Sequence, residues 1–142
     1  VMGHLGLTPQ SVNAFGGFKV QGKTEESARA LLDNACALEE AGAFAIVLEC
    51  VPAALAELVT SRVSIPTIGI GAGAACDGQI LVYQDMLGMT SGFSPKFARH
   101  FAEVGDVMRK GFSDYIEAVG AGTFPADSET FHAGDDVIKK LY

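Results

Sequence analysis

The sequence predicts an α/β protein built on a parallel β-sheet. Short apolar runs recur along the chain, and segments with helical apolar spacing lie between them. Connections of this kind place consecutive strands parallel to one another. Polar side chains follow several of the apolar runs, where parallel α/β folds bind their ligands. The 142 residues, of which 49% are apolar, suffice for one domain with one core.

The first residues predict the end of a strand followed by a long loop. We interpret Val1-Met2 as the last residues of a strand, so that His4 lies at its carboxyl end. A single histidine in a loop is most often a hydrogen-bonded structural residue. A second reactive residue at the next strand end would favour a functional role. Glycines interrupt residues 11–23, which we expect to form a loop.

A helix is predicted over residues 24–41. Thr24 is a favourable N-cap, acidic residues occupy the first turn, and Gly42 ends the helix. Apolar side chains recur at helical spacing and should cover one face of the sheet. They are Ala28, Leu31, Leu32, Ala35 and Leu38.

The run 44–48 predicts a strand that is buried on both faces. Glu49 lies where this strand ends, and Pro52 then begins a helix that reaches about residue 62. Apolar neighbours on both sides should leave the Glu49 carboxylate poorly solvated, which favours the role of a general base. The alternative is a structural glutamate that caps the helix or interacts with its dipole.

Two further strands are predicted over residues 65–73 and 79–83. The first ends in alternating glycines, which either cradle a phosphate or let the backbone pass close to a ligand or neighbouring strand; we prefer the second interpretation. Asp77 begins a turn between the strands. Asp85 follows the second strand, but a carboxylate without a partner is weak support for a metal site.

The remaining sequence predicts a long helix over residues 95–118, followed by an extended tail over 123–142 with a short helical turn near Val137. His100 should lie on the solvent side of the helix. Large apolar side chains form a stripe typical of a core or a subunit interface. They are Phe97, Phe101, Val104, Met108, Phe112 and Tyr115.

These elements predict four parallel strands with reactive residues at their carboxyl ends, about half of a (β/α)₈ barrel of ~250 residues. A small doubly wound sheet is the alternative fold. We expect one domain over residues 1–142, in which 1–94 form the barrel part and 95–142 the carboxyl-terminal helix and tail.

Charge and cysteine content exclude several classes of function. The formal charge of −7 argues against nucleic acid and anionic membrane as partners. No apolar run reaches the ~18 residues of a membrane span. The odd number of cysteines favours free thiols in a reducing compartment, so we expect a cytoplasmic protein. A nucleophilic Cys50 is a less favoured alternative, since no histidine lies near it in sequence.

Six motifs in register along the chain, up to about His132, resemble the carboxyl-terminal half of the ketopantoate hydroxymethyltransferase (3-methyl-2-oxobutanoate hydroxymethyltransferase) family. Together they are far more specific than any one of them. They are GHLGLTPQS at 3–11, FGGFKVQGK at 15–23, LEEAGA at 38–43, VLECVP at 47–52, IPTIGIGAG at 65–73 and CDGQILV at 76–82.

The resemblance implies a (β/α)₈ TIM barrel of the phosphoenolpyruvate mutase type, of which this chain supplies about the second half. The implied reaction transfers a one-carbon unit from 5,10-methylenetetrahydrofolate to 3-methyl-2-oxobutanoate and gives 2-dehydropantoate, for pantothenate biosynthesis. It also implies a Mg²⁺ ion that stabilises the enolate. The family's base falls on Glu49 and its active-site histidine on His4. Its apolar contacts to the branched carbons of the substrate fall on Ile70, Ile80 and Val82.

The resemblance further implies partners for this chain. The family's metal ligands belong to the amino-terminal half, and neither Asp77 nor Asp85 matches them. We therefore expect the site to need that missing half, and the protein to form a large homo-oligomer, a decamer by resemblance. The alternatives are another Mg²⁺-dependent, enolate-forming barrel lyase without folate dependence, or a non-catalytic assembly fragment.

Overall fold

Four parallel strands form the centre of the protein in the computed structural model, which describes residues 1–134. The strands are β1 (Met2–Gly6), β2 (Ala45–Glu49), β3 (Thr67–Ile70) and β4 (Gly78–Gln79), and they pair in this order. The predicted α/β class with a parallel sheet is confirmed. Because β1 and β4 are the edges of an open sheet in these residues, the barrel remains a prediction.

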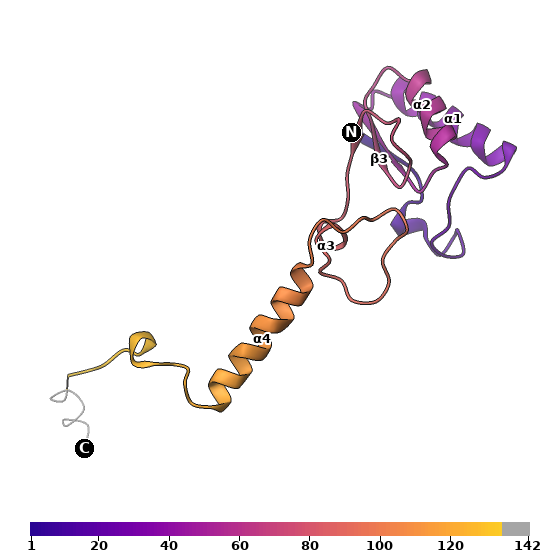
Figure 1. The fold of residues 1–142 in the computed structure, drawn as a ribbon. Helices are drawn as coiled ribbons and strands as arrows, with labels where there is room; N and C mark the ends of the chain where they lie inside the picture. Colours follow the sequence, from indigo (N-terminus) through magenta and orange to yellow (C-terminus); the bar gives the residue numbers. More distant parts are fainter. Residues whose placement is uncertain (135–142) are drawn as a thin grey trace.

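Two helices, α1 (Glu25–Glu40) and α2 (Ala53–Arg62), cover one face of the sheet (Figure 1). Alternate side chains of β2, Ile46 and Leu48, are fully buried against this layer. The α1 residues Leu31 and Ala35 and the α2 residue Val59 join them in one core. The intervening β2 side chains point to the opposite face, because successive side chains of a strand alternate. That face is therefore left for other contacts.

The start and end of α1 follow the predicted capping chemistry. The Thr24 hydroxyl accepts a hydrogen bond from the Ser27 backbone N–H at 3.2 Å, and the Ser27 hydroxyl accepts one from the Thr24 N–H at 3.0 Å. This reciprocal capping box satisfies two amide groups that the helix cannot pair internally. Gly42 follows the helix with a φ of +89°, a conformation that glycine adopts without steric cost.

The structure differs from the prediction at two strands. β1 continues through Gly6, so His4 lies within the strand instead of beyond its end. The predicted strand over 79–83 is wrong, because β4 ends at Gln79 and residues Tyr83–Met86 form the short helix α3. The backbone N–H groups of Met86 and Leu87 donate to the carbonyls of residues 82 and 83, which closes a helical turn. The alternation of apolar residues in this segment did not indicate these helical hydrogen bonds.

The predicted long helix also begins later than expected. Residues 95–103 are irregular, and α4 spans Val104–Gly120. The Phe101 N–H donates to the Met86 carbonyl and the Val104 N–H to that of Leu87, so this segment is tied to α3. The placement of His100 on a helix is therefore wrong; its Nδ1 lies 3.1 Å from Glu103 Oε1.

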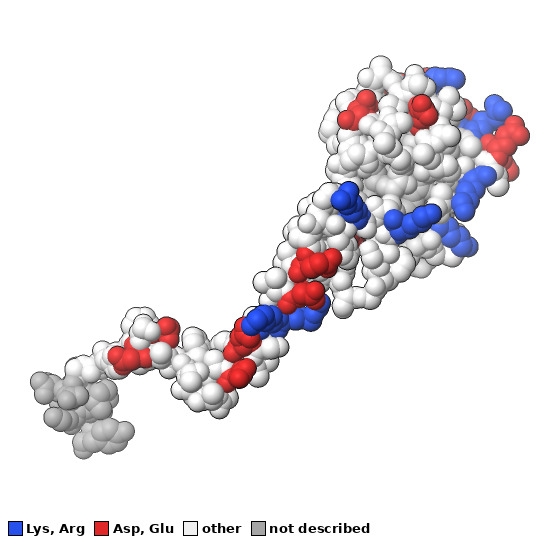
Figure 2. Space-filling model, in the orientation of Figure 1, with Lys and Arg blue, Asp and Glu red and all other residues white. Residues whose placement is uncertain are grey.

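Helix α4 extends away from the sheet and its two helices (Figure 1). Acidic and basic side chains lie along it (Figure 2), including the Lys110–Asp114 ion pair at 2.6 Å. Most of its large apolar side chains are exposed, and a short 3₁₀ turn, Asp127–Glu129, follows. No helix within residues 1–134 is both long and apolar enough to cross a membrane. The turn predicted near Val137 lies outside the described residues.

Asp77 fastens the turn before β4 to the buried start of β3. Its Oδ2 accepts hydrogen bonds from the Thr67 backbone N–H at 2.8 Å and the Thr67 hydroxyl at 3.0 Å. Thr67 is fully buried, and its hydroxyl also lies 2.8 Å from that of Thr60 in α2. The Thr67 N–H, followed by its hydroxyl, holds the pKa of Asp77 below its ordinary value of 3.8.

We predict that Asp77→Ala lowers the melting temperature at neutral pH, because it leaves the buried backbone N–H of Thr67 unpaired. The ionised carboxylate stabilises the fold above pH 3.8, and this contribution is lost as the pH falls through the lower folded-state value. The difference in melting temperature from the parent should therefore shrink in acid. Asp85→Ala removes the same charge without a buried partner and is the control. Equal effects of the two variants would contradict the prediction.

Candidate active site

His4 and Glu49 meet on the face of the sheet that the helices leave uncovered. Glu49 pairs with Gly6, and His4 pairs with Val47, so the two side chains lie on the same face of adjacent strands. His4 Nε2 is 3.0 Å from Glu49 Oε2, and the side chains are 31% and 15% exposed. An ionised carboxylate only accepts hydrogen bonds, so His4 donates from Nε2. The structure thus brings the two residues that the sequence singled out into direct contact.

The backbone at the end of β2 connects three other segments. The Glu49 carbonyl accepts from the Leu7 N–H at 2.8 Å, and the Cys50 N–H donates to the Ile70 carbonyl at 2.9 Å. The Cys50 carbonyl accepts from Gln21 at 2.9 Å, in the loop before α1. These bonds hold the ends of β1, β2 and β3 together directly beside the Glu49 carboxylate.

Cys50 adopts a left-handed backbone conformation, with a φ of +51°. A non-glycine residue in this region costs about 1–3 kcal/mol, and such residues cluster at functional sites. Burial, followed by the nearby Glu49 carboxylate, raises the pKa of the Cys50 thiol. The thiolate is the reactive form, so this environment argues against the alternative of a nucleophilic Cys50.

Gly6 has no room for a side chain. Its φ is +90°, and a Cβ placed there would lie 2.1 Å from the Glu49 carbonyl oxygen and 2.7 Å from Val51 Cγ2. The strands can therefore approach closely at Glu49 only because residue 6 is glycine. Nothing in the sequence pattern distinguished this glycine from its neighbours before the fold was known.

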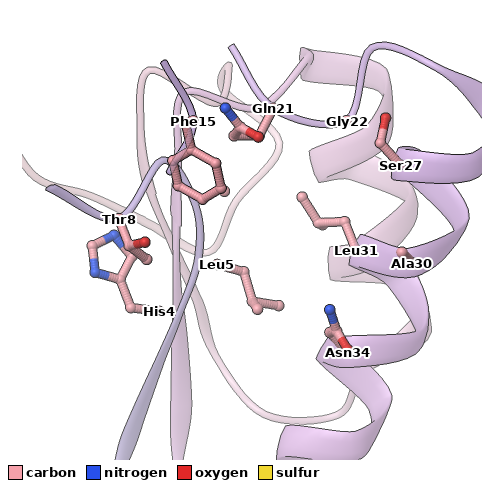
Figure 3. Close-up of a pocket in the computed structure, with 11 residues that line it drawn as sticks. His4, Leu5, Thr8, Phe15, Gln21, Gly22, Ser27, Ala30, Leu31 and Asn34 are labelled. Atoms are coloured by element: carbon pink, nitrogen blue, oxygen red, sulfur yellow. The ribbon is translucent and has the colours of Figure 1, made fainter. Parts of the chain in front are cut away.

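A cavity of about 380 Å³ lies beside His4, between β1, the following loop and α1. Thr8, Phe15 and Gln21 line it from the loop, and Asn34 lines it from α1 (Figure 3). The imidazole thus contacts Glu49 on one face of β1, whereas the cavity lies on the α1 side of the same strand (Figure 3).

A second cavity of about 380 Å³ lies beyond β3, where the glycine-rich turn, residues 79–81 and Phe97 surround it. Of the three predicted apolar contacts, Ile70 is buried at the end of β3 and pairs with Glu49. Ile80 lines the second cavity and is about half exposed. Val82 is also about half exposed, lines neither cavity and directly precedes α3. The structure therefore brings Ile70 close to Glu49 and leaves Val82 apart.

Phe97 lines a cavity, although its spacing in the sequence predicted a helical stripe. It lies in the irregular segment before α4. Pro95 and the glycine at residue 92 are signals that could have indicated a loop here.

The described residues do not fit a Mg²⁺ site. Within residues 1–134, no three histidine, cysteine or acidic side chains are placed to hold one ion. Asp77 is engaged by Thr67, and the nearest polar partner of Asp85 is the Thr90 hydroxyl, at 3.4 Å.

Comparisons with known proteins identify the family of this chain. The sequence model of ketopantoate hydroxymethyltransferase matches residues 1–127. This chain belongs to that family. The family resemblance is thereby confirmed, and the assignment to the carboxyl-terminal half remains a prediction.

Three relatives named 3-methyl-2-oxobutanoate hydroxymethyltransferase illustrate the similarity. Over all 142 residues of this chain, identity is 66% with the protein of Clostridium novyi, 63% with that of Enterococcus faecalis and 59% with that of Clostridioides difficile. In each case the match covers 52% of the relative. The chain thus spans about half the length of these curated members of the ketopantoate hydroxymethyltransferase family.

We predict that Gly6→Ala separates β1 from the end of β2 and breaks the His4–Glu49 hydrogen bond. Gly17→Ala is the matched control, because Gly17 also has a positive φ, +113°, but a Cβ there meets nothing within 4 Å. The left-handed conformation alone costs either variant about 1–2 kcal/mol. Urea denaturation should show a larger loss for Gly6→Ala, and the ¹⁵N shifts of His4 should change only in that variant. Equal stability of the two variants, with unchanged His4 shifts, would contradict the prediction.

Proposed function

We propose that the full-length protein containing this chain transfers a hydroxymethyl group from 5,10-methylenetetrahydrofolate to 3-methyl-2-oxobutanoate. The observation that carries the proposal is the contact between His4 of β1 and Glu49, the last residue of the adjacent parallel strand β2, in a member of this family. The product is 2-dehydropantoate, and one water molecule supplies the hydroxyl oxygen. Folate returns as tetrahydrofolate.

Glu49 is the proposed general base. Its largely buried carboxylate takes the proton from C3 of the oxo acid, beside the keto group, and the resulting enolate carbon forms the new bond to the one-carbon unit. His4 supports this role by donating from Nε2 to Glu49, which holds the carboxylate in one orientation. Because the His4 imidazole is beside the proposed base and 31% exposed, we propose that it contacts the bound oxo acid as well.

Ile70, Ile80 and Val82 are the proposed apolar contacts to the branched carbons of the substrate. The burial of Ile70 opposite Glu49 and the position of Ile80 in the second cavity support two of these assignments. For Val82, the family resemblance is the support. Apolar side chains near the base favour a substrate whose reacting carbon carries methyl groups.

The proposed Mg²⁺ ion is not accounted for by the described residues. The curated relatives are about twice as long as this chain, and we place the ion's carboxylate ligands in the portion that the chain does not match. When bound, the ion would act as a Lewis acid toward the oxo acid. The residues of this chain account for the proton transfer and for the apolar contacts.

The structure suits a role as the carboxyl-terminal part of a (β/α)₈ barrel. β1 and β4 each leave one backbone edge unpaired within the described sheet, and an open edge favours pairing with further strands. The exposed apolar side chains of α4 support association into a homo-oligomer, for which we propose a decamer by family resemblance. The same helix is the observation that favours the alternative function of an assembly module.

We predict that Glu49→Gln slows exchange of the substrate's C3 proton by roughly 10²–10⁴-fold, the typical contribution of a general base. The experiment uses a full-length chimera, in which this chain replaces the matching half of the Clostridium novyi relative. Exchange into deuterated water is followed by NMR, with and without methylenetetrahydrofolate. Glu57→Gln, on the exposed side of α2, is the control.

The outcomes of this experiment separate the candidate functions. Unchanged exchange in Glu49→Gln would remove Glu49 from the role of base. A lyase would release product from an oxo acid without needing folate. An assembly module would leave the chimera folded and oligomeric but without exchange or transfer.

We also predict that this chain by itself binds Mg²⁺ no better than an exposed carboxylate pair does. Mg²⁺ requires near-octahedral oxygen coordination, usually by one or two carboxylates and substrate oxygens. Calorimetric titration of Mg²⁺ with the oxo acid should show substrate-dependent binding for the chimera and none for the chain. Tight binding by the chain would contradict the prediction and direct attention to Asp77 and Asp85.

A further inference from the structure

The ring of Phe97 lies directly on the glycine turn that follows β3. A Cβ placed on Gly71 would be 2.7 Å from Phe97 Cδ1, 2.9 Å from Cγ and 3.2 Å from Cε1. Gly71 also has a φ of +67°. The Phe97 ring therefore occupies the space that a side chain at residue 71 would need. This contact brings the segment that carries Phe97 against the end of the sheet.

This contact places Phe97 in the wall of the second cavity. Ile80 and Leu81 add further apolar lining, and the glycine-rich turn contributes Gly71, Gly73 and Ala74. The Gln79 amide donates to the Gly73 carbonyl at 2.8 Å, so its donor is already used within the protein. A space of about 380 Å³ with aliphatic and aromatic walls suits a small branched alkyl group.

The cavity follows the end of β3, the strand that pairs with the strand of the proposed base. Gly71 directly follows Ile70, whose strand position pairs with Glu49, and the Cys50 N–H binds the Ile70 carbonyl at 2.9 Å. Neighbouring strands lie only about 4.8 Å apart, so an oxo acid whose C3 is at Glu49 can extend its branch toward Phe97.

The segment that carries Phe97 is held at both sides by backbone hydrogen bonds. The Ala98 N–H donates to the Pro95 carbonyl at 2.9 Å, and the Phe101 N–H donates to Met86 at 2.8 Å. The Phe97 ring is therefore held in place by a turn that is hydrogen-bonded to the end of α3. A residue that limits the size of a cavity needs such a fixed position.

We propose that Phe97 is a specificity-determining residue: its ring on Gly71 closes the cavity beyond β3 and limits the length of the alkyl branch on the 2-oxo acid substrate. This inference rests on the proposed function and adds to it the residue that sets substrate size. Nothing in the reaction passes through Phe97, whose contribution is the shape of the apolar wall.

The test compares two oxo acids that differ by one methylene, 3-methyl-2-oxobutanoate and 3-methyl-2-oxopentanoate, in the full-length chimera. One methylene in an apolar pocket changes kcat/KM by about 10–200-fold. Phe97→Ala should raise the ratio of kcat/KM for the longer over the shorter acid by about 10-fold or more. Phe97→Trp should lower it. The ratio of dissociation constants, measured by calorimetry, should move in the same direction.

Phe93→Ala is the matched control, because Phe93 belongs to the same segment but is 81% exposed and lines neither cavity. Phe97→Leu serves if the alanine variant does not fold, and should raise the ratio by a smaller factor. If the chimera is active and the Phe97 ratios match that of Phe93→Ala, this inference is overturned and the proposed function stands. If the folded parent chimera turns over neither acid, the proposed function fails and the inference with it.

Discussion

The close approach of β1 to the end of β2 is the constraint on which the candidate site depends. Gly6 leaves room for the Glu49 carbonyl, and the Leu7 N–H then reaches that carbonyl at 2.8 Å. The same approach sets His4 within 3.0 Å of the Glu49 carboxylate. A residue with a side chain at position 6 would push the two strands apart where the polar pair has to meet. The packing of β1 against β2 and the geometry of the candidate site thus depend on the same backbone contact between residues 6 and 49.

The side chains on the two faces of the sheet differ in their roles. On one face, β2 buries Ile46 and Leu48 under α1 and α2, which provides the apolar core. On the other, the same strand presents Glu49 beside His4. Strand alternation makes both possible within five residues of β2. The core fixes the position of the strand, and this in turn fixes the position of the carboxylate.

The segments after the sheet add to the site from a distance in sequence. The residues between α3 and α4 fold back so that Phe97 covers Gly71, while α4 itself extends away from the sheet (Figure 1). The same part of the chain therefore contributes a wall to a cavity and, through the exposed side chains of α4, an apolar surface for association. Both features belong to a chain that spans about half the length of its curated relatives.

Local patterns in the sequence determined the parallel α/β class, the capped helix α1 and the place of Glu49 at the end of a buried strand. They could do so because capping, apolar periodicity and strand ends depend on neighbouring residues. The family followed from motifs in register. Patterns misplaced the segments 79–83 and 95–103, whose hydrogen bonds join residues across turns that apolar spacing does not record.

Only the tertiary structure decided that His4 touches Glu49, that Gly6 must lack a side chain and that Phe97 lines a cavity. Each of these contacts joins residues at least 26 positions apart, as Phe97 and Gly71 do. Their formation depends on strand register and on the path of a loop, which the packing of the whole sheet and its helices sets.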